Sequence, residues 1–210
     1  MRPVVERKSG RSVLMNPTRQ KIFQYLCSYP CRHIRAMERD MKLKLPAVIW
    51  HLRLLEDAGF LSSARFRRKK VYFPKGMIAG DDVPVFAALE NRHVRQICAS
   101  LMERGGMTQR ELWAATGTYQ QSVLWYLSYL EKLGIVAAKR TGTRVSYNLT
   151  RRLEDVKEHG SVIWDDFKTS LLKRLANDGV APRVLRDDAK GIIIQLDTGQ
   201  RRFNLKVERI

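Results

Sequence analysis

Val48–Leu61 reads VIWHLRLLEDAGFL, and seventy-five residues later Val123–Val136 reads VLWYLSYLEKLGIV. Apolar residues recur at helical spacing in both stretches, and a glycine near the end of each is the usual left-handed cap of a helix. Self-similarity at a fixed period is typical of a repeated structural unit. The two stretches therefore predict that one kind of helix is built twice in this chain.

The similarity extends well beyond these two helices. At an unbroken offset of 75, residues 18–61 lie over residues 93–136. Identical pairs occur at Ile22/Ile97, Leu26/Leu101, Arg35/Arg110, Val48/Val123, Trp50/Trp125, Leu52/Leu127, Leu55/Leu130, Glu56/Glu131 and Gly59/Gly134. KVYF (70–73) matches RVSY (144–147) at an offset of 74, which predicts a one-residue deletion in a loop. Chance similarity of two amphipathic helices would not keep register across three elements, so we expect an internal duplication.

Each copy predicts three helices followed by a hairpin. In the first copy we expect a helix from Pro17, helices over 34–41 and Pro46–Gly59, and strands over 60–65 and 70–73 around a tip at 66–69. In the second copy we expect a helix from Pro84 to about Glu103 capped by Asp82, helices over 109–116 and 120–133, and a hairpin turning at 141–143.

The segment 151–210 is not a third copy. It predicts a helix from about Ser161 that ends before Asn177, then short strands over 183–186, 191–196 and 202–207. Some fifty residues would have a thin core alone, so we expect this segment to pack on the second copy or on another subunit.

The predicted fold class is therefore α+β, mostly α with small β. It comprises two tandem winged helix-turn-helix domains and a small C-terminal helix-and-meander domain. The expected domains are a basic N-terminal arm (1–15), the first winged helix-turn-helix domain (16–78), the second (79–150) and the C-terminal α+β domain (151–210).

Charge is distributed unevenly along the chain. The net charge is +18, of which +13 lies in residues 1–80, +2 in 81–160 and +3 in 161–210. Such an excess favours a polyanionic partner, and it places the contact mostly in the first copy. No apolar run is long enough to span a bilayer, the start lacks the apolar segment of a signal peptide, and three cysteines favour a reducing compartment. We expect a cytoplasmic protein without membrane contact.

The stretches NPTRQKIFQYL, HIRAMERD and LPAVIWHLRLLEDAGFL, followed by a basic hairpin and KVYFPKG, resemble the ArsR-like winged helix-turn-helix transcription regulators. The archaeal tandem type, in which "WHL…LE..G" and a closing "YFP.G" recur, is the most similar, over roughly residues 13–150. The resemblance implies promoter DNA as ligand, with the third helix in the major groove and the wing on the flanking backbone. Metal-sensing members carry a cysteine pair on the second helix, whereas residues 34–41 have none.

The third helix has an apolar face and an opposite outward face. Val48, Leu52 and Leu55 share the first, and we expect the outward face to meet base edges in the major groove. The candidate DNA-binding residues on and beside this helix are Lys44, Pro46, Ala47, Trp50 and Arg53 in the first copy, and Gln121 and Trp125 in the second. The alternative is that both tryptophans lean on their own wings as peripheral core, in which case Lys44, Ala47 and Arg53 do the reading.

The first hairpin is the stronger charge signal. It carries Arg65, Arg67, Arg68, Lys69 and Lys70, which favours phosphate contact, whereas the second wing carries only Lys139, Arg140 and Arg144. The outward face of the second helix, with Ser128 and Tyr129 beside Trp125, also suits a protein surface. The sequence therefore predicts that the first copy binds DNA and that the second serves largely for assembly. The arm has two open interpretations, insertion into a minor groove or a disordered tail.

No catalytic or cofactor motif occurs, and the spacing of Cys27, Cys31 and His33 is not that of a zinc site, so we expect no enzyme activity, cofactor or metal. The predicted function is a sequence-specific, double-stranded DNA-binding transcription regulator, a homodimer that contacts the basal transcription machinery. The alternatives are a non-specific chromatin or nucleic-acid-binding protein and a winged-helix protein-interaction scaffold. A monomer whose two copies mimic a dimer is the alternative assembly.

Overall fold

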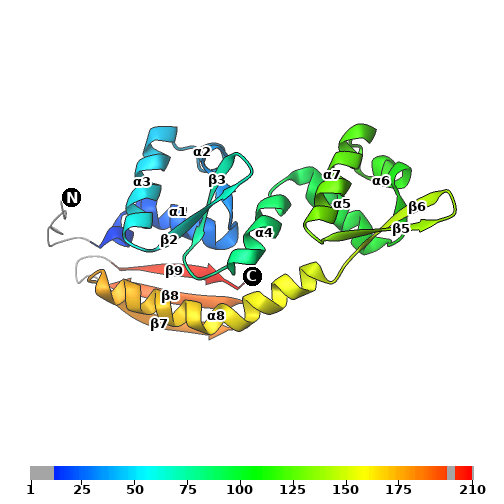
Figure 1. Ribbon diagram of the computed structural model, residues 1–210. Coiled ribbons are helices and arrows are strands. Elements are labelled where there is room, and N and C mark those ends of the chain that lie inside the picture. The colour runs from blue at the N-terminus through cyan, green and yellow to red at the C-terminus, as the bar shows by residue number, and fades with distance from the viewer. Residues whose placement is uncertain (1–11, 198–201, 210) are drawn as a thin grey trace, which may run out of the picture.

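The computed structural model describes residues 12–197 and 202–209. Two similar units lie side by side, a three-stranded sheet lies beneath the first unit, and a long helix runs from the second unit along the first (Figure 1). The expected N-terminal arm falls mostly outside the described residues, as do residues 198–201 between the last two strands.

The first unit follows the predicted element order. It consists of η1 (Val13–Met15), α1 (Pro17–Ser28), β1 (Arg32–His33), α2 (Ile34–Met41), α3 (Leu45–Asp57), β2 (Leu61–Phe66) and β3 (Lys69–Pro74). The Asn16 side chain accepts hydrogen bonds from the backbone N–H groups of Thr18 and Arg19 and so fixes the start of α1. The antiparallel sheet has the order β1-β3-β2, and its first strand was not expected from the sequence.

The second unit has the same plan with one more helix. Its elements are η2 (Gly80–Asp82), α4 (Val83–Leu89), α5 (Arg92–Glu103), β4 (Met107–Thr108), α6 (Gln109–Thr116), α7 (Gln120–Lys132), β5 (Val136–Thr141) and β6 (Arg144–Leu149), with the sheet order β4-β6-β5. The prediction of one helix over Pro84–Glu103 is wrong. Asn91 adopts an extended conformation, and its side chain caps α5 by accepting from the backbone N–H of His93 at 2.9 Å, which separates α4 from α5.

The duplication is visible in the backbone dihedral angles. Residues with left-handed backbone coincide at an offset of 75: Cys31 with Gly106, Lys42 with Gly117, Gly59 with Gly134, and Arg67 with Gly142. Strand pairing keeps the same offset, because Arg32 pairs with Tyr72 and Met107 with Tyr147. The expected one-residue deletion is therefore wrong: the hairpins have equal length, and KVYF matches RVSY one residue out of register.

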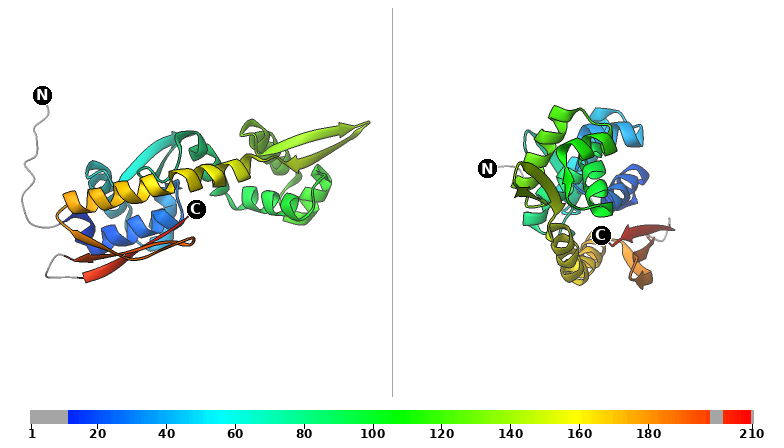
Figure 2. Two further views of the ribbon diagram at one scale, coloured as in Figure 1. Left: turned by 90° about the horizontal axis from the view of Figure 1, so that it is seen from below. Right: turned by 90° about the vertical axis from the view of Figure 1, so that its right-hand side faces the viewer.

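The C-terminal segment is α8 (Arg152–Asn177), β7 (Ala181–Asp188), β8 (Gly191–Asp197) and β9 (Arg202–Glu208), with the sheet order β7-β8-β9. Its helix begins nine residues earlier than the expected Ser161 and runs from the second unit back along the first (Figure 2). Asp82, expected to cap a helix, makes no such bond. Its buried carboxylate instead pairs with Arg152 at 2.9 Å and contacts His159 Nδ1 at 3.0 Å, which holds the start of α8.

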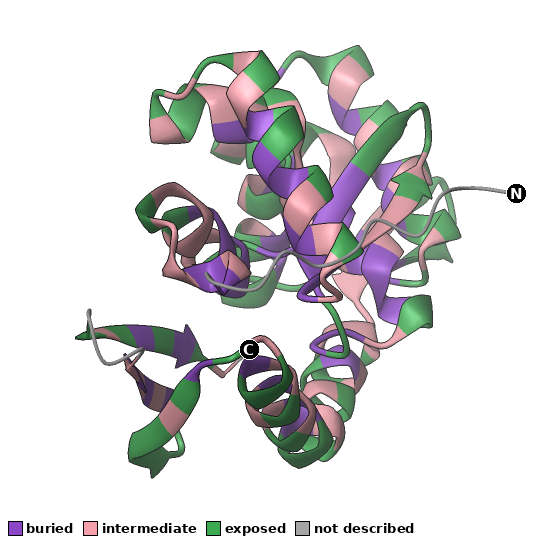
Figure 3. Ribbon diagram, turned by 90° about the vertical axis from the view of Figure 1, so that its left-hand side faces the viewer, coloured by how far each residue is buried: buried purple, intermediate pink, exposed green. Residues whose placement is uncertain are grey.

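The C-terminal segment packs on the first unit, so the expectation that it covers the second copy is wrong. Phe167 and Leu171 of α8 and Leu205 of β9 share one buried core with Phe23 of α1 (Figure 3). Arg174 adds two bonds to backbone carbonyls of the first unit, those of Gly59 at 3.0 Å and Lys75 at 2.9 Å. The second unit has a separate core. The first unit therefore owes part of its core to the C-terminal segment.

Candidate nucleic-acid interface

Helix α3 presents its two faces as the sequence predicts. Val48, Leu52 and Leu55 are fully buried in the core of the first unit. Pro46 lies in the first turn, where its missing N–H costs no intrahelical hydrogen bond, and Lys44 immediately precedes the helix. The opposite side of α3 is left to solvent.

Trp50 and Arg53 lie on that exposed side. Trp50 is 55% exposed, and the Arg53 side chain is 82% exposed and 3.8 Å from Asp57 of the same helix. The Trp50 ring contacts the His51 ring edge-on, and the Arg19 guanidinium of α1 lies 5.9 Å from its centroid. Among the described residues, no aromatic ring or cation of the first wing contacts the Trp50 ring. Lys44 and Pro46 are also exposed, and Ala47 is partly so.

The β2–β3 hairpin, hereafter the first wing, turns tightly at Arg67 and Arg68, because Phe66 pairs with Lys69. All five predicted cations are exposed, but they fall into two groups. Lys70 binds Glu56 of α3 at 3.0 Å, and Arg67 is held by aromatic rings. Arg65, Arg68 and Lys69 form no ion pair within the part of the chain that the structure describes. These three keep their full charge for an external anion.

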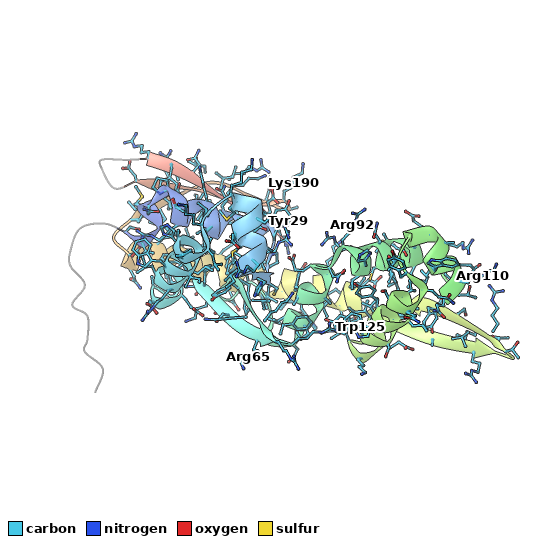
Figure 4. All side chains as sticks on the ribbon, turned by 90° about the horizontal axis from the view of Figure 1, so that it is seen from above. Tyr29, Arg65, Arg92, Arg110, Trp125 and Lys190 are labelled. Carbon is cyan, nitrogen blue, oxygen red and sulfur yellow. The ribbon has the colours of Figure 1, made fainter. Side chains whose placement is uncertain are left out.

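Arg67 and Trp125, both predicted to touch DNA, contact each other across the two units. The Arg67 guanidinium lies 3.8 Å from the ring centroid of Tyr129 and 4.5 Å from that of Trp125. The two rings stack, with centroids 5.9 Å apart and an interplanar angle of 25°. We call Arg67, Trp125 and Tyr129 the clasp; Figure 4 shows Trp125 beside the tip of the first wing. Phe66 supports the clasp with its ring 6.2 Å from that of Tyr129.

The clasp is made by residues that differ between the two copies. Arg67 is equivalent to Gly142, and Tyr129 is equivalent to Leu54. Arg67 has φ 54°, a conformation that costs a residue with a Cβ about 1–2 kcal/mol and glycine almost nothing. Cation–π contact with two rings offsets a cost of this size. The second wing has no arginine at the position equivalent to Arg67, and α3 has no tyrosine at the position equivalent to Tyr129. The second wing therefore cannot form the reciprocal contact with α3.

Over the residues that the structure describes, the second wing has fewer cations without an ion pair than the first wing. Arg144 lies 3.7 Å from Glu111, which also binds Arg104 at 2.7 Å, whereas Gln121, Lys139 and Arg140 are exposed. Trp125 is still 52% exposed, but one side of its ring faces Arg67. The sequence marked Tyr129 as fit for a protein surface but gave no signal for its partner, because the partner lies on the other unit.

All three cysteines are buried and free. Burial raises the pKa of the Cys27 and Cys31 thiols, and it raises the pKa of Cys98 to about 11. No group of three or more potential His, Cys, Asp or Glu metal ligands occurs among the described residues. Within the same residues, no helix has the length and apolar character needed to cross a membrane.

Comparison with known proteins gives one similar sequence and several weak structural similarities. No family model matches the chain. An uncharacterized HTH-type transcriptional regulator of Methanocaldococcus jannaschii is 29% identical over 141 residues, which cover 67% of this chain but only 35% of that protein. The chain thus spans about a third of the relative's length.

Solved structures share less. The homodimeric winged helix-turn-helix DNA-binding domain of a possible ArsR-family transcriptional regulator from Mycobacterium bovis is 27% identical, covering 44% of this chain and 83% of that one, with a TM-score of 0.33. ScpB from Mycobacterium tuberculosis covers 70% of this chain and 97% of its own, at 12% identity and a TM-score of 0.27.

Proposed function

We propose that the protein is a sequence-specific regulator of transcription that binds double-stranded DNA through its first unit. The observation that carries the proposal is the exposed side of α3, which presents Trp50 and Arg53, together with three cations of the first wing that form no ion pair among the described residues. A helix of this kind fits the major groove, with the wing on the flanking phosphates. The name of the Methanocaldococcus jannaschii relative supports the same role.

The two units are, in this proposal, tandem winged helix-turn-helix domains over residues 16–78 and 79–150. Arg53 reads a base or holds a phosphate, Trp50 contacts thymine methyls or sugar edges, and Arg65, Arg68 and Lys69 contact the backbone. The second domain serves mainly as a docking surface for the first wing. Its Trp125 belongs to the clasp, and its Gln121 and Arg144 are secondary DNA contacts. The arm over 1–15 and the C-terminal domain over 151–210 complete the chain, which acts in the cytoplasm.

We further propose a homodimer, since small operator sites are usually two-fold and one strongly charged unit per chain then meets two half-sites about 34 Å apart. Contact with the basal transcription machinery would follow from binding at promoters. The solved Mycobacterium bovis domain is itself homodimeric.

Selection of bound sites from genomic fragments tests the function. We expect one recurrent motif, bound at least about 10³-fold more tightly than competitor DNA at a stated salt concentration. Arg53→Ala should then cost about 1–3 kcal/mol on that motif and little on random DNA, while Ser128→Ala at the equivalent position of α7 is the matched control. A protein without a motif would be a non-specific nucleic-acid binder, and equal losses on both DNAs would make Arg53 a phosphate contact.

A further inference from the structure

The two units enclose a cleft whose lining shares Arg68 and Lys69 with the DNA-binding surface proposed above. Its volume is about 720 Å³, within the range of ligand pockets in proteins. β1, α2 and the tip of the first wing form one wall, and α4, its C-terminal flank, α5 and α7 form the other. The clasp lies at this cleft, because Arg67, Trp125 and Tyr129 all line it.

One side of the cleft is strongly cationic. The charged residues in its described lining are Arg32, Arg35, Arg39, Arg67, Arg68, Lys69 and, with the opposite charge, Glu90. Glu90 is already bound by Arg32, and Arg35 and Arg39 lie 3.1 and 3.0 Å from Glu38 and Asp40 of their own helix. Exposed pairs of this kind contribute only about 0–1 kcal/mol, so a phosphate can replace them. Arg68 and Lys69 form no ion pair among the described residues. His33, in the same wall, has a lowered pKa because burial disfavours its charged form and because Lys69 and Arg35 repel a proton there. The cleft thus favours an anion.

The other side is aromatic and holds an unsatisfied polar group. Trp125, Tyr126 and Tyr129 line it, Phe66 of the opposite wall lies against Tyr129, and Tyr126 also stacks on His93 with centroids 5.7 Å apart. The Tyr129 hydroxyl is buried and has no hydrogen-bond partner among the described residues. A buried hydroxyl without a partner is rare in native proteins, and it points to a polar group that enters the cleft.

We propose that this cleft binds a nucleotide, with the phosphate on Arg35, Arg39 and Arg68 and the base against the rings of α7. Arginine suits phosphate through its paired N–H donors, and aromatic rings bind bases by stacking. A phosphate of the DNA backbone shares this chemistry. A duplex, however, keeps its own bases paired and stacked, so it would reach the exposed arginines without placing a base against the rings. The assignment does not rest on the DNA-binding proposal.

The test is calorimetric titration of the full chain with AMP, GMP, CMP and UMP, with adenosine and inorganic phosphate as partial ligands. We expect at least one nucleotide to bind, and each partial ligand to bind about ten-fold or more weakly. Arg35→Ala should weaken the nucleotide about ten-fold, because it removes a charge-assisted hydrogen bond. Arg110→Ala is the matched control: it is the equivalent exposed arginine on α6, and it lies outside the cleft.

The same variants separate a small nucleotide from backbone phosphate. If none of the four nucleotides binds, or if Arg110→Ala weakens binding as much as Arg35→Ala, the assignment is overturned. If Arg35→Ala flattens the salt dependence for random duplex while nucleotides fail to bind, the cleft belongs to DNA backbone. Tyr129→Phe keeps the ring of the clasp and removes only the hydroxyl, so unchanged nucleotide affinity in this variant would contradict the placement of the ligand.

Discussion

The first wing carries two matched pairs of cations that the structure separates by their contacts. Arg67 and Lys70 are engaged, the first by the clasp and the second by Glu56, whereas Arg68 and Lys69 have no ion-paired partner in the described chain. Each pair consists of one arginine and one lysine. Replacing either pair by alanine therefore removes the same formal charge from the same hairpin.

The expected magnitude follows from counterion release. Each phosphate contact adds about 0.9 to the slope of log affinity against log salt, so the double change of Arg68 and Lys69 should flatten it by about 1.8. The double change of Arg67 and Lys70 should flatten it by less than about one, because these side chains would have to leave existing partners to reach phosphate. Neutralising all four cations should flatten this slope by roughly two units. Four cations that were all free to contact phosphate would give a change of about three to four units.

The assay is fluorescence anisotropy of one labelled DNA fragment across about 50–200 mM salt, after circular dichroism has shown that each variant is folded. Replacement of Lys139 and Arg140 in the second wing is a further control, with an expected change below about one unit. Equal slopes for the two first-wing pairs would refute the reasoning. The clasp and the Glu56 ion pair would then not hold their cations back from DNA.

Three further outcomes are expected. Phe167→Ala should lower the free energy of unfolding of the first unit by about 3–5 kcal/mol in urea titrations, since its ring is buried in the shared core; a loss near zero would contradict that core. A double-mutant cycle of Arg67→Ala and Tyr129→Leu should give a coupling energy of about 1 kcal/mol, and a value below about 0.3 would exclude the clasp in solution. Light scattering should report a dimer, whereas a monomer that protects one undivided site would overturn the two-fold arrangement.

Local patterns predicted much of the fold. The helix over Ile34–Met41 is confirmed to the residue, and both hairpins lie at the expected places. These elements depend on caps, glycine positions and alternating apolar residues, all of which lie within a few residues of one another. The outward side of Trp50 follows from helical geometry in the same way.

The wrong predictions share a physical cause. The break at Asn91 depends on a cap inside an otherwise helical pattern, and the early start of α8 depends on Asp82, some seventy residues away, which holds Arg152. The position of the C-terminal segment depends on which apolar surface lies near it in space. Charge patterns and apolar periodicity do not show which distant residues contact one another in the folded chain. The clasp could not be predicted for the same reason. The sequence identified the cations of the first wing and the rings of α7, but not that they contact each other.

The clasp depends on differences between the two copies. In the proposed DNA complex, two identical copies would present the same helix face twice, and a rigid pair would have to fit both helices to one duplex. Tyr129 in place of a leucine and Arg67 in place of a glycine instead join the wing of one copy to the helix of the other. Figure 1 shows the consequence: the first wing leans toward the second unit, while the β5–β6 hairpin extends away from both. The second helix thereby becomes a support for the first wing, and α3 keeps the exposed face that a base-reading helix requires.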